Sequence, residues 1–322
     1  MGRAEPAWSE LVTARLWPLW KRMPSRGRAA GEAALVVAAV MAPGGAVALA
    51  PRWGAPLTGL LVGGLLFAAG VALVHGAAAW QQDGPPRRAL RLLLLLACAA
   101  TIVGGPLLLD SASAAAVGLA STSDRTMAAM VLRNGGTLGL VWLLLRANRQ
   151  GPTQLGLGRT RWGSETLFGL AALTGALALH LAVSAALALG VGLWRADALG
   201  AEAEQRAGAM GQLLTTSNVP AFVGAMVFAA AFEEIAFRGF VLPRARHATS
   251  SWAVALVVVA IPFGLGHLYE GPLAVVQTGV LGLYFSALLM WRGHLLAAIV
   301  AHVGFNTVMM SLALALRHAG AL

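Results

Sequence analysis

Residues 218–242 read NVPAFVGAMVFAAAFEEIAFRGFVL, an apolar run of membrane-spanning length that carries two glutamates and an arginine. A helix needs about 20 apolar residues to cross the hydrocarbon core of a bilayer. The run is continuous rather than alternating, which favours a helix over a strand. An ionisable residue inside such a helix is costly unless it is paired, so it marks a functional site by default. We therefore expect a membrane helix that carries chemistry.

The rest of the chain has the same apolar character. Of its 322 residues, 58% are hydrophobic and 11% are charged, whereas a soluble domain carries about 25% charged residues. Lipid offers the backbone no hydrogen-bond partners, so spanning segments must be helices or closed barrels. The sequence predicts an all-α fold, a polytopic transmembrane helical bundle with about eight to nine spans. They are expected near residues 32–50, 56–80, 91–109, 127–145, 166–194, 218–242, 252–268, 272–291 and 294–316.

The basic residues indicate how the chain lies in the membrane. The net charge is +10, but the arginines lie in short loops between apolar runs rather than on one soluble face, which argues against a nucleic-acid partner. Most of the 23 basic residues fall on the side of the N-terminus, as expected of cytoplasmic loops. We expect a multi-pass protein of the cell (plasma or inner) membrane with a cytoplasmic N-terminus. Arg133, inside the fourth run, is either a snorkelling boundary residue or a sign that this span is misplaced.

The charged residues of the sixth run are spaced for two different roles. Glu234 and Arg238 are four residues apart, so they can pair along one helix face. Glu233 points about 100° away from Glu234 on an α-helix. We expect Glu233 to lack a local countercharge and to be available for chemistry.

Two later runs also carry polar groups. The seventh contains Phe263 and His267, and the last places His302 and Asn306 on one face at positions i and i+4. A carboxylate or imidazole can take a proton from water. An imidazolium or amide N–H can stabilise the oxyanion that forms when water attacks a carbonyl. The three helices together predict a hydrolytic site.

These residues resemble a known family in order and spacing. Glu-Glu-x-x-x-Arg at 233–238, Phe-x-x-x-His at 263–267 and His-x-x-x-Asn at 302–306 resemble the CAAX protease and bacteriocin-processing family, CPBP or Abi, of intramembrane endopeptidases. The resemblance covers roughly residues 165–317. We accordingly divide the chain into a cytoplasmic N-terminal segment (1–30), N-terminal transmembrane helices (31–160) and a CPBP-like catalytic core (161–322).

The resemblance implies a role for each motif residue. Glu233 would be the general base that activates water, aided by His267, and His302 with Asn306 would stabilise the oxyanion. Glu234, Arg238 and Phe263 would support them.

The resemblance also bears on cofactors and partners. Glu233, His267 and His302 have the chemistry to hold zinc, but the family resemblance favours glutamate-activated water, so we expect no cofactor and no metal. The partners implied are a peptide or membrane-protein substrate and the lipid bilayer. The natural substrate and the oligomeric state stay open.

Other interpretations compete with the protease. The acids and Arg238 can be a buried ion network that fixes helix register, and His302 with Asn306 can be interhelical hydrogen-bond glue. At the level of function, the alternatives are a non-catalytic membrane scaffold or immunity protein, and a transporter that uses the same buried residues. The lack of a visible internal repeat counts against a transporter.

Overall fold

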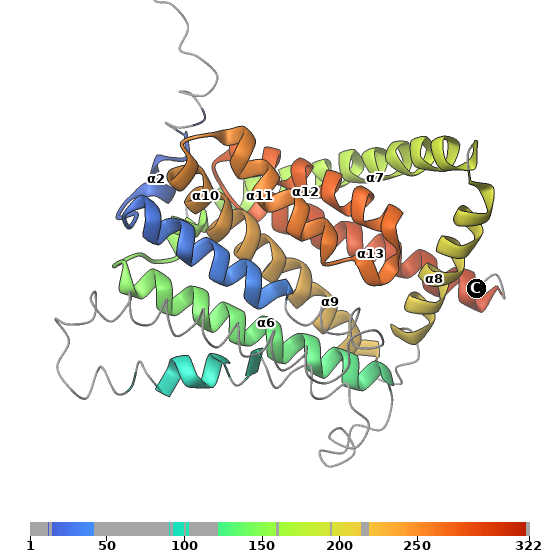
Figure 1. Ribbon diagram of the computed structural model, residues 1–322, viewed down its shortest axis with the longest axis horizontal. Helices are drawn as coiled ribbons and strands as arrows, with labels where there is room; N and C mark the ends of the chain where they lie inside the picture. Colours follow the sequence, from blue (N-terminus) through green and yellow to red (C-terminus); the bar gives the residue numbers. More distant parts are fainter. Residues whose placement is uncertain are drawn as a thin grey trace, which may run out of the picture.

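The computed structural model describes residues 12, 15–41, 90, 93–99, 101–102, 122–158, 161–193, 195–213 and 219–319. The regular structure of these residues is helical throughout, as predicted (Figure 1). The helices are α2 (Trp17–Trp20), a helix over 26–41, a short helix over 93–99, α6 (Thr122–Ala147), η1 (Pro152–Leu155), α7 (Trp162–Gly192), α8 (Ala196–Leu213), α9 (Val219–Glu233), η3 (Glu234–Val241), α10 (Leu242–Thr249), α11 (Trp252–Leu265), η4 (Leu268–Glu270), α12 (Pro272–Arg292) and α13 (Leu296–His318).

The molecule is a helical membrane bundle. Within the described residues, four helices are long and apolar enough to span a bilayer, in α6, α7, α12 and α13, and α11 is a shorter apolar helix. From residue 122 onward, the bounds of α6, α7, α11, α12 and α13 follow the predicted runs closely, whereas α8 matches no predicted span and the run 218–242 is divided among α9, η3 and α10. The predicted span 56–80 lies outside the described residues, and 32–50 and 91–109 are described only in part. The total of eight to nine spans therefore stays a prediction.

Helix α7 shows most directly that the bundle belongs in lipid. Its 31 residues extend about 46 Å at 1.5 Å per residue. Leu167, Leu181 and Leu189 are about 70% exposed along it, an arrangement that water would penalise and a bilayer stabilises. The other side of α7 packs along α13, where Gly169 lets the two helices approach closely.

Helix α6 runs without interruption through the polar pair that weakens its sequence signal. The Nε of Arg133 donates to Oδ1 of Asn134 at 2.9 Å, and Asn134 is completely buried. The hydroxyl group of Thr137 donates a hydrogen bond to the Arg133 carbonyl at 2.8 Å. The interpretation of Arg133 as a sign of a misplaced span is therefore wrong, because the bundle interior surrounds these polar groups.

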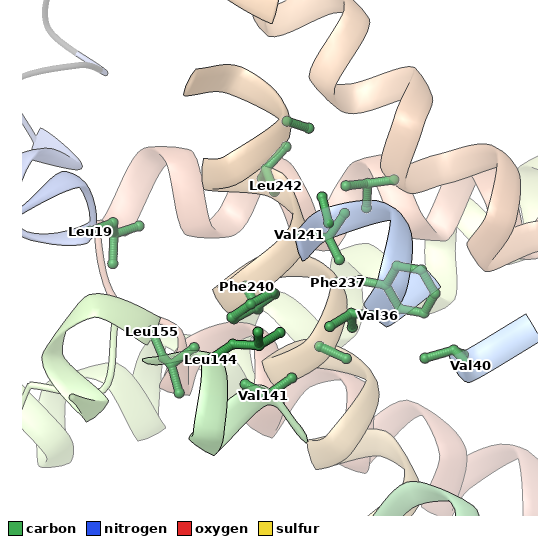
Figure 2. Packing of buried hydrophobic residues seen from close by; sticks show 14 of the residues in the cluster. Leu19, Val36, Val40, Val141, Leu144, Leu155, Phe237, Phe240, Val241 and Leu242 are labelled. Atoms are coloured by element: carbon green, nitrogen blue, oxygen red, sulfur yellow. The ribbon is translucent and has the colours of Figure 1, made fainter. Parts of the chain in front are cut away.

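The largest apolar core surrounds η3 and α10. Figure 2 shows Phe237, Phe240 and Val241 packed among side chains of the 26–41 helix, α6 and η1. Phe237 and Phe240 are at most 2% exposed. Because interiors are close-packed, this core holds the segment that follows Glu233 in one position.

Basic segments that are far apart in the sequence meet at one end of the bundle. His247 lies 3.0 Å from the Pro24 carbonyl through Nε2, Gln150 donates to the Lys21 carbonyl at 3.0 Å, and Arg22 donates to the Arg149 carbonyl. Figure 1 places α2 and α10 at this end and α8 at the other. We call it the basic end; it is the end that the sequence predicts to be cytoplasmic.

Candidate active site

The two glutamates lie where the helix geometry changes. Helices α9, η3 and α10 follow one another without a break, and η3, from Glu234 to Val241, is a π-helix. A π-helix bonds i to i+5 and holds more residues per turn than an α-helix, and such turns are frequent at functional sites. Successive side chains are therefore less widely separated around the axis than on an α-helix. Glu233 is the last residue of α9 and Glu234 the first of η3, and both approach the same neighbour.

That neighbour is His302 of α13. Its Nδ1 lies 2.9 Å from Oε1 of Glu234, and its Nε2 lies 3.8 Å from Oε2 of Glu233. A carboxylate accepts hydrogen bonds, so the ring carries its Nδ1 proton toward Glu234 and turns Nε2 toward Glu233. Glu233 makes no ion pair within its own helix among the described residues; its neighbour is this imidazole of α13, which the spacing within the helix does not predict.

Arg238 holds Glu234 in place. Its Nη1 lies 3.0 Å from Oε1 of Glu234, which confirms the pairing expected from the spacing. Its Nη2 donates to the Gly282 carbonyl of α12 at 3.0 Å, and both charged side chains are fully buried. A buried ion pair is most favourable when its remaining polar atoms are also hydrogen-bonded. Nη2 of Arg238 meets this condition, whereas Nε of Arg238 and Oε2 of Glu234 are buried without a hydrogen-bond partner among the described residues.

Aromatic rings close the site on two sides. The Phe263 ring lies 4.0 Å from the Arg238 guanidinium carbon, a cation–π contact. The Phe285 ring stacks on the His302 ring at 4.7 Å and 18°. Gly282 leaves the space in which Phe263 and Arg238 meet, since a Cβ there would lie 2.9 Å from the phenyl ring. Phe285 and Gly282 are site residues that the motif pattern did not contain.

His267 lies beside the carboxylates rather than on them. It follows the end of α11, and its Nδ1 lies 3.0 Å from the Phe263 carbonyl. Its ring contacts Phe263 at 5.4 Å and stacks near Tyr269 at 6.1 Å, while Phe263 contacts His302 at 6.0 Å. Phe263 therefore links the two imidazoles, and His267 makes no direct hydrogen bond to either glutamate among the described residues.

Asn306 lies one turn beyond His302 on α13 and is half-buried. Within the part of the chain that the structure describes, its amide makes no hydrogen bond. Its place one turn from His302 agrees with the i and i+4 spacing.

Arg133 is a cation of the site that the sequence interpretation missed. It belongs to α6, which packs against α9, and its guanidinium lies within electrostatic range of Glu233 and Tyr269. Apart from the Nε bond to Asn134, it makes no hydrogen bond within the described residues. The signal was present in the sequence, because an arginine in the middle of an apolar run is a functional candidate.

The residues do not gather as a three-ligand metal site. Among the described residues, no group of three His, Cys, Asp or Glu side chains lies close enough to hold a metal ion. Glu233 and His302 are neighbours, but the Nδ1 of His267 is engaged with the Phe263 carbonyl.

Fold and site together define a polytopic helical membrane protein with a buried glutamate–histidine–arginine centre. Residues 215–308 match the model of the family described as type II CAAX prenyl endopeptidase Rce1-like. The match contains all three motifs and confirms the resemblance drawn from them. No curated protein and no solved structure significantly matches the chain.

Proposed function

We propose that the protein is an intramembrane endopeptidase that hydrolyses a peptide bond in a membrane-associated protein or peptide by means of water activated by Glu233. The observation that carries the proposal is the pair of adjacent carboxylates facing one imidazole inside a membrane bundle. This pair lies in the segment that matches the endopeptidase family. Ionisable groups inside a membrane helix cost stability, so their presence here favours a functional role over packing alone.

In the proposed reaction, Glu233 removes a proton from water as the water oxygen bonds to the scissile carbonyl carbon. The carbonyl oxygen becomes an oxyanion, which N–H donors of His302 and Asn306 stabilise. Because Glu234 holds the Nδ1 proton of His302, the ring donates through Nε2 in its imidazolium form. The C–N bond then breaks, and the leaving amine takes the proton held by Glu233.

Supporting residues keep the catalytic side chains in position. Glu234 fixes the orientation of His302, and Arg238 in turn fixes Glu234. His267 acts from the Phe263 side, where it helps to place the water. A displacement of about 1 Å in such a site can lower the rate about 100-fold.

The test uses the full chain reconstituted in proteoliposomes. The substrate is a quenched fluorescent peptide that ends in a farnesylated cysteine, two aliphatic residues and methionine, and the same peptide without its lipid serves as a second substrate. Glu233→Gln should lower kcat by at least about 100-fold, the usual contribution of a general base. Glu204→Gln, an exposed glutamate of α8, is the matched control and should leave kcat unchanged. Equal rates for wild type and Glu233→Gln would remove Glu233 from the mechanism.

A chelator separates the metal-free reaction from the alternative. We expect 1,10-phenanthroline to leave cleavage unchanged. Inhibition that added Zn²⁺ reverses would favour the arrangement in which Glu233, His267 and His302 rearrange around a metal ion.

A further inference from the structure

A cavity of about 820 Å³ opens at the basic end of the bundle, where α12 ends and α7 begins. Its walls include Arg15, Arg161 and Arg292, together with Trp291, Gly293 and His294. None of these residues belongs to the Glu233 site. The volume is that of a cavity for a small-molecule ligand.

The charges around the cavity are unbalanced. Arg292 is paired with the fully buried Glu165 at 2.7 Å, so its charge is compensated. Arg15 donates to the Trp291 carbonyl, a neutral partner, and Arg161 is exposed with no side-chain hydrogen bond to another described residue. No lining residue among those that the structure describes is acidic. Within this part of the chain, Arg15 and Arg161 therefore give the cavity two positive charges without an acidic partner.

The backbone adds to this field. Arg161 is the N-cap of α7, and no side chain caps that helix end. The first N–H groups of a helix have no partners within it and carry a partial positive charge. Phosphate groups bind readily at such ends. Gly293 has φ +67°, and a Cβ there would lie 2.9 Å from the Cγ of Arg15, so the glycine makes room for the arginine stem.

The surroundings place the cavity at the level of lipid headgroups. Trp162 and Trp291 are 55% and 58% exposed beside it, as expected of the aromatic belt at a membrane interface. Further along α7, Leu167 and Leu170 are exposed. A molecule with a phosphate in the cavity can therefore lay its apolar chains on α7.

We propose that this cavity binds the headgroup of an anionic phospholipid from the leaflet at the basic end. Basic pockets between membrane helices on the cytoplasmic side are suited to such headgroups. The two uncompensated arginines favour a lipid with net negative charge over a zwitterionic one, whose ammonium group they would repel. The binding site does not depend on the proteolytic function.

The experiment measures lipid binding to the detergent-purified full chain by native mass spectrometry. Phosphatidylglycerol should bind the wild type more tightly than phosphatidylcholine. The double variant Arg15→Gln/Arg161→Gln should bind phosphatidylglycerol about 30-fold more weakly, from the loss of two cations near the membrane surface. Arg146→Gln removes an exposed arginine of α6 outside the cavity and should change the affinity less than twofold, and Glu233→Gln should not change it.

Four results would overturn the proposal. They are equal binding of phosphatidylcholine by the wild type, an equal loss in Arg146→Gln, unchanged binding by the double variant, and displacement of the lipid by millimolar inorganic phosphate, which would indicate a site for soluble phosphate. The charge-preserving variant Arg15→Lys/Arg161→Lys guards against misfolding, because it should retain most of the affinity. If the double variant fails to fold, this lysine variant and the salt dependence of wild-type binding decide, since salt must weaken a charge-driven site.

Discussion

The two ring nitrogens of His302 face the carboxylates of Glu234 and Glu233. The ring of Phe285 covers one face of the imidazole. This leaves the imidazole little freedom of orientation. The ring of Phe263 packs nearby and also covers Arg238. The position of one side chain therefore depends on residues from four helices, and the motif spacing alone does not reveal that dependence.

Glu234→Gln should separate orientation from stability. The change leaves the buried Arg238 without its countercharge, which costs about 3 kcal/mol in the free energy of unfolding. It also weakens the hold on His302, so kcat should fall. The double variant Glu234→Gln/Arg238→Gln removes both charges and should regain part of the stability while kcat stays low. Chemical unfolding and peptide cleavage measure the two effects, and a double variant that regains activity would contradict the orienting role.

Arg133→Gln tests the cation contributed by α6. A positive charge near the reacting atoms stabilises negative charge that develops there, so its loss should lower kcat/KM about tenfold. Arg133→Lys keeps the charge and should retain a larger share of the activity. If both variants cleave the peptide like wild type, the electrostatic contact with Glu233 has no part in the reaction.

For single residues of the site, the sequence predicted the identities of the polar side chains better than their contacts. The Glu234–Arg238 pair follows from helix spacing and is present. The approach of Glu233 to His302 does not follow, because it depends on the packing of a helix some 70 residues later in the chain. Arg133 stood out as a charged residue inside an apolar run. Its proximity to Glu233 did not follow from the sequence, since no local pattern links α6 to α9.

Helices α11 and α12 approach closely beside the site. A Cβ on Gly264 would lie 2.4 Å from the Val275 carbonyl oxygen of α12. Phe263 lies in the last turn of α11, and His267 follows directly after the end of this helix. The distance between these two helices therefore sets where both rings lie.

Gly264→Ala should force α11 and α12 apart. Overpacking of this kind costs about 1–3 kcal/mol, and the displaced Phe263 should lower cleavage as well. Gly208→Ala in α8 meets nothing within 4 Å and should be neutral or stabilising by up to about 1 kcal/mol. Thermal unfolding of the two variants in the same detergent measures the difference. Equal stability would show that the helices can part without strain.

The sequence predicted these elements well because apolar length is a strong signal. Span 272–291 became α12, Pro272–Arg292, and 252–268 became α11, Trp252–Leu265. The conversion of 218–242 into α9, η3 and the start of α10 could not be foreseen, because an apolar run looks the same in an α-helix and a π-helix.

A buried polar cluster joins the N-terminal helix 26–41 to the helix that carries the site. Glu32 receives hydrogen bonds from Arg244 at 2.7 Å, from Asn148 at 2.9 Å and from Arg28 at 3.1 Å. Arg244 and Glu32 are almost fully buried, and Gln150 binds the other side of Arg244 at 2.9 Å. The helix over 26–41 is thus joined to α10 by a buried ion pair.

Glu32→Gln should destabilise the molecule by about 3 kcal/mol, because it leaves Arg244 buried without a countercharge. Arg28→Gln removes only the more exposed partner and should cost less than about 1 kcal/mol. Denaturant titration of both variants tests the ranking. A similar loss for the two would show that Arg244 finds another partner.

The fold class followed from composition, since 58% hydrophobic residues in continuous runs leave few alternatives to a helical membrane bundle. The contacts between its N-terminal and C-terminal parts did not follow. The sequence placed Glu32 near the edge of a span and Arg244 in a loop, and nothing in their spacing connects residues that are 212 positions apart.

Helix α7, about 46 Å long, exceeds the hydrocarbon thickness of about 30 Å, and it packs along α13, which carries His302. A thinner membrane must increase the tilt of a long helix or deform around it, so hydrophobic mismatch at α7 should reach the site through α13. The cleavage rate in phosphatidylcholine liposomes should therefore rise as the fatty acids are lengthened and then level off. A rate independent of fatty-acid length would show that mismatch at α7 does not reach the site through α13. A rate that depends on this length would make bilayer thickness a factor that controls catalysis.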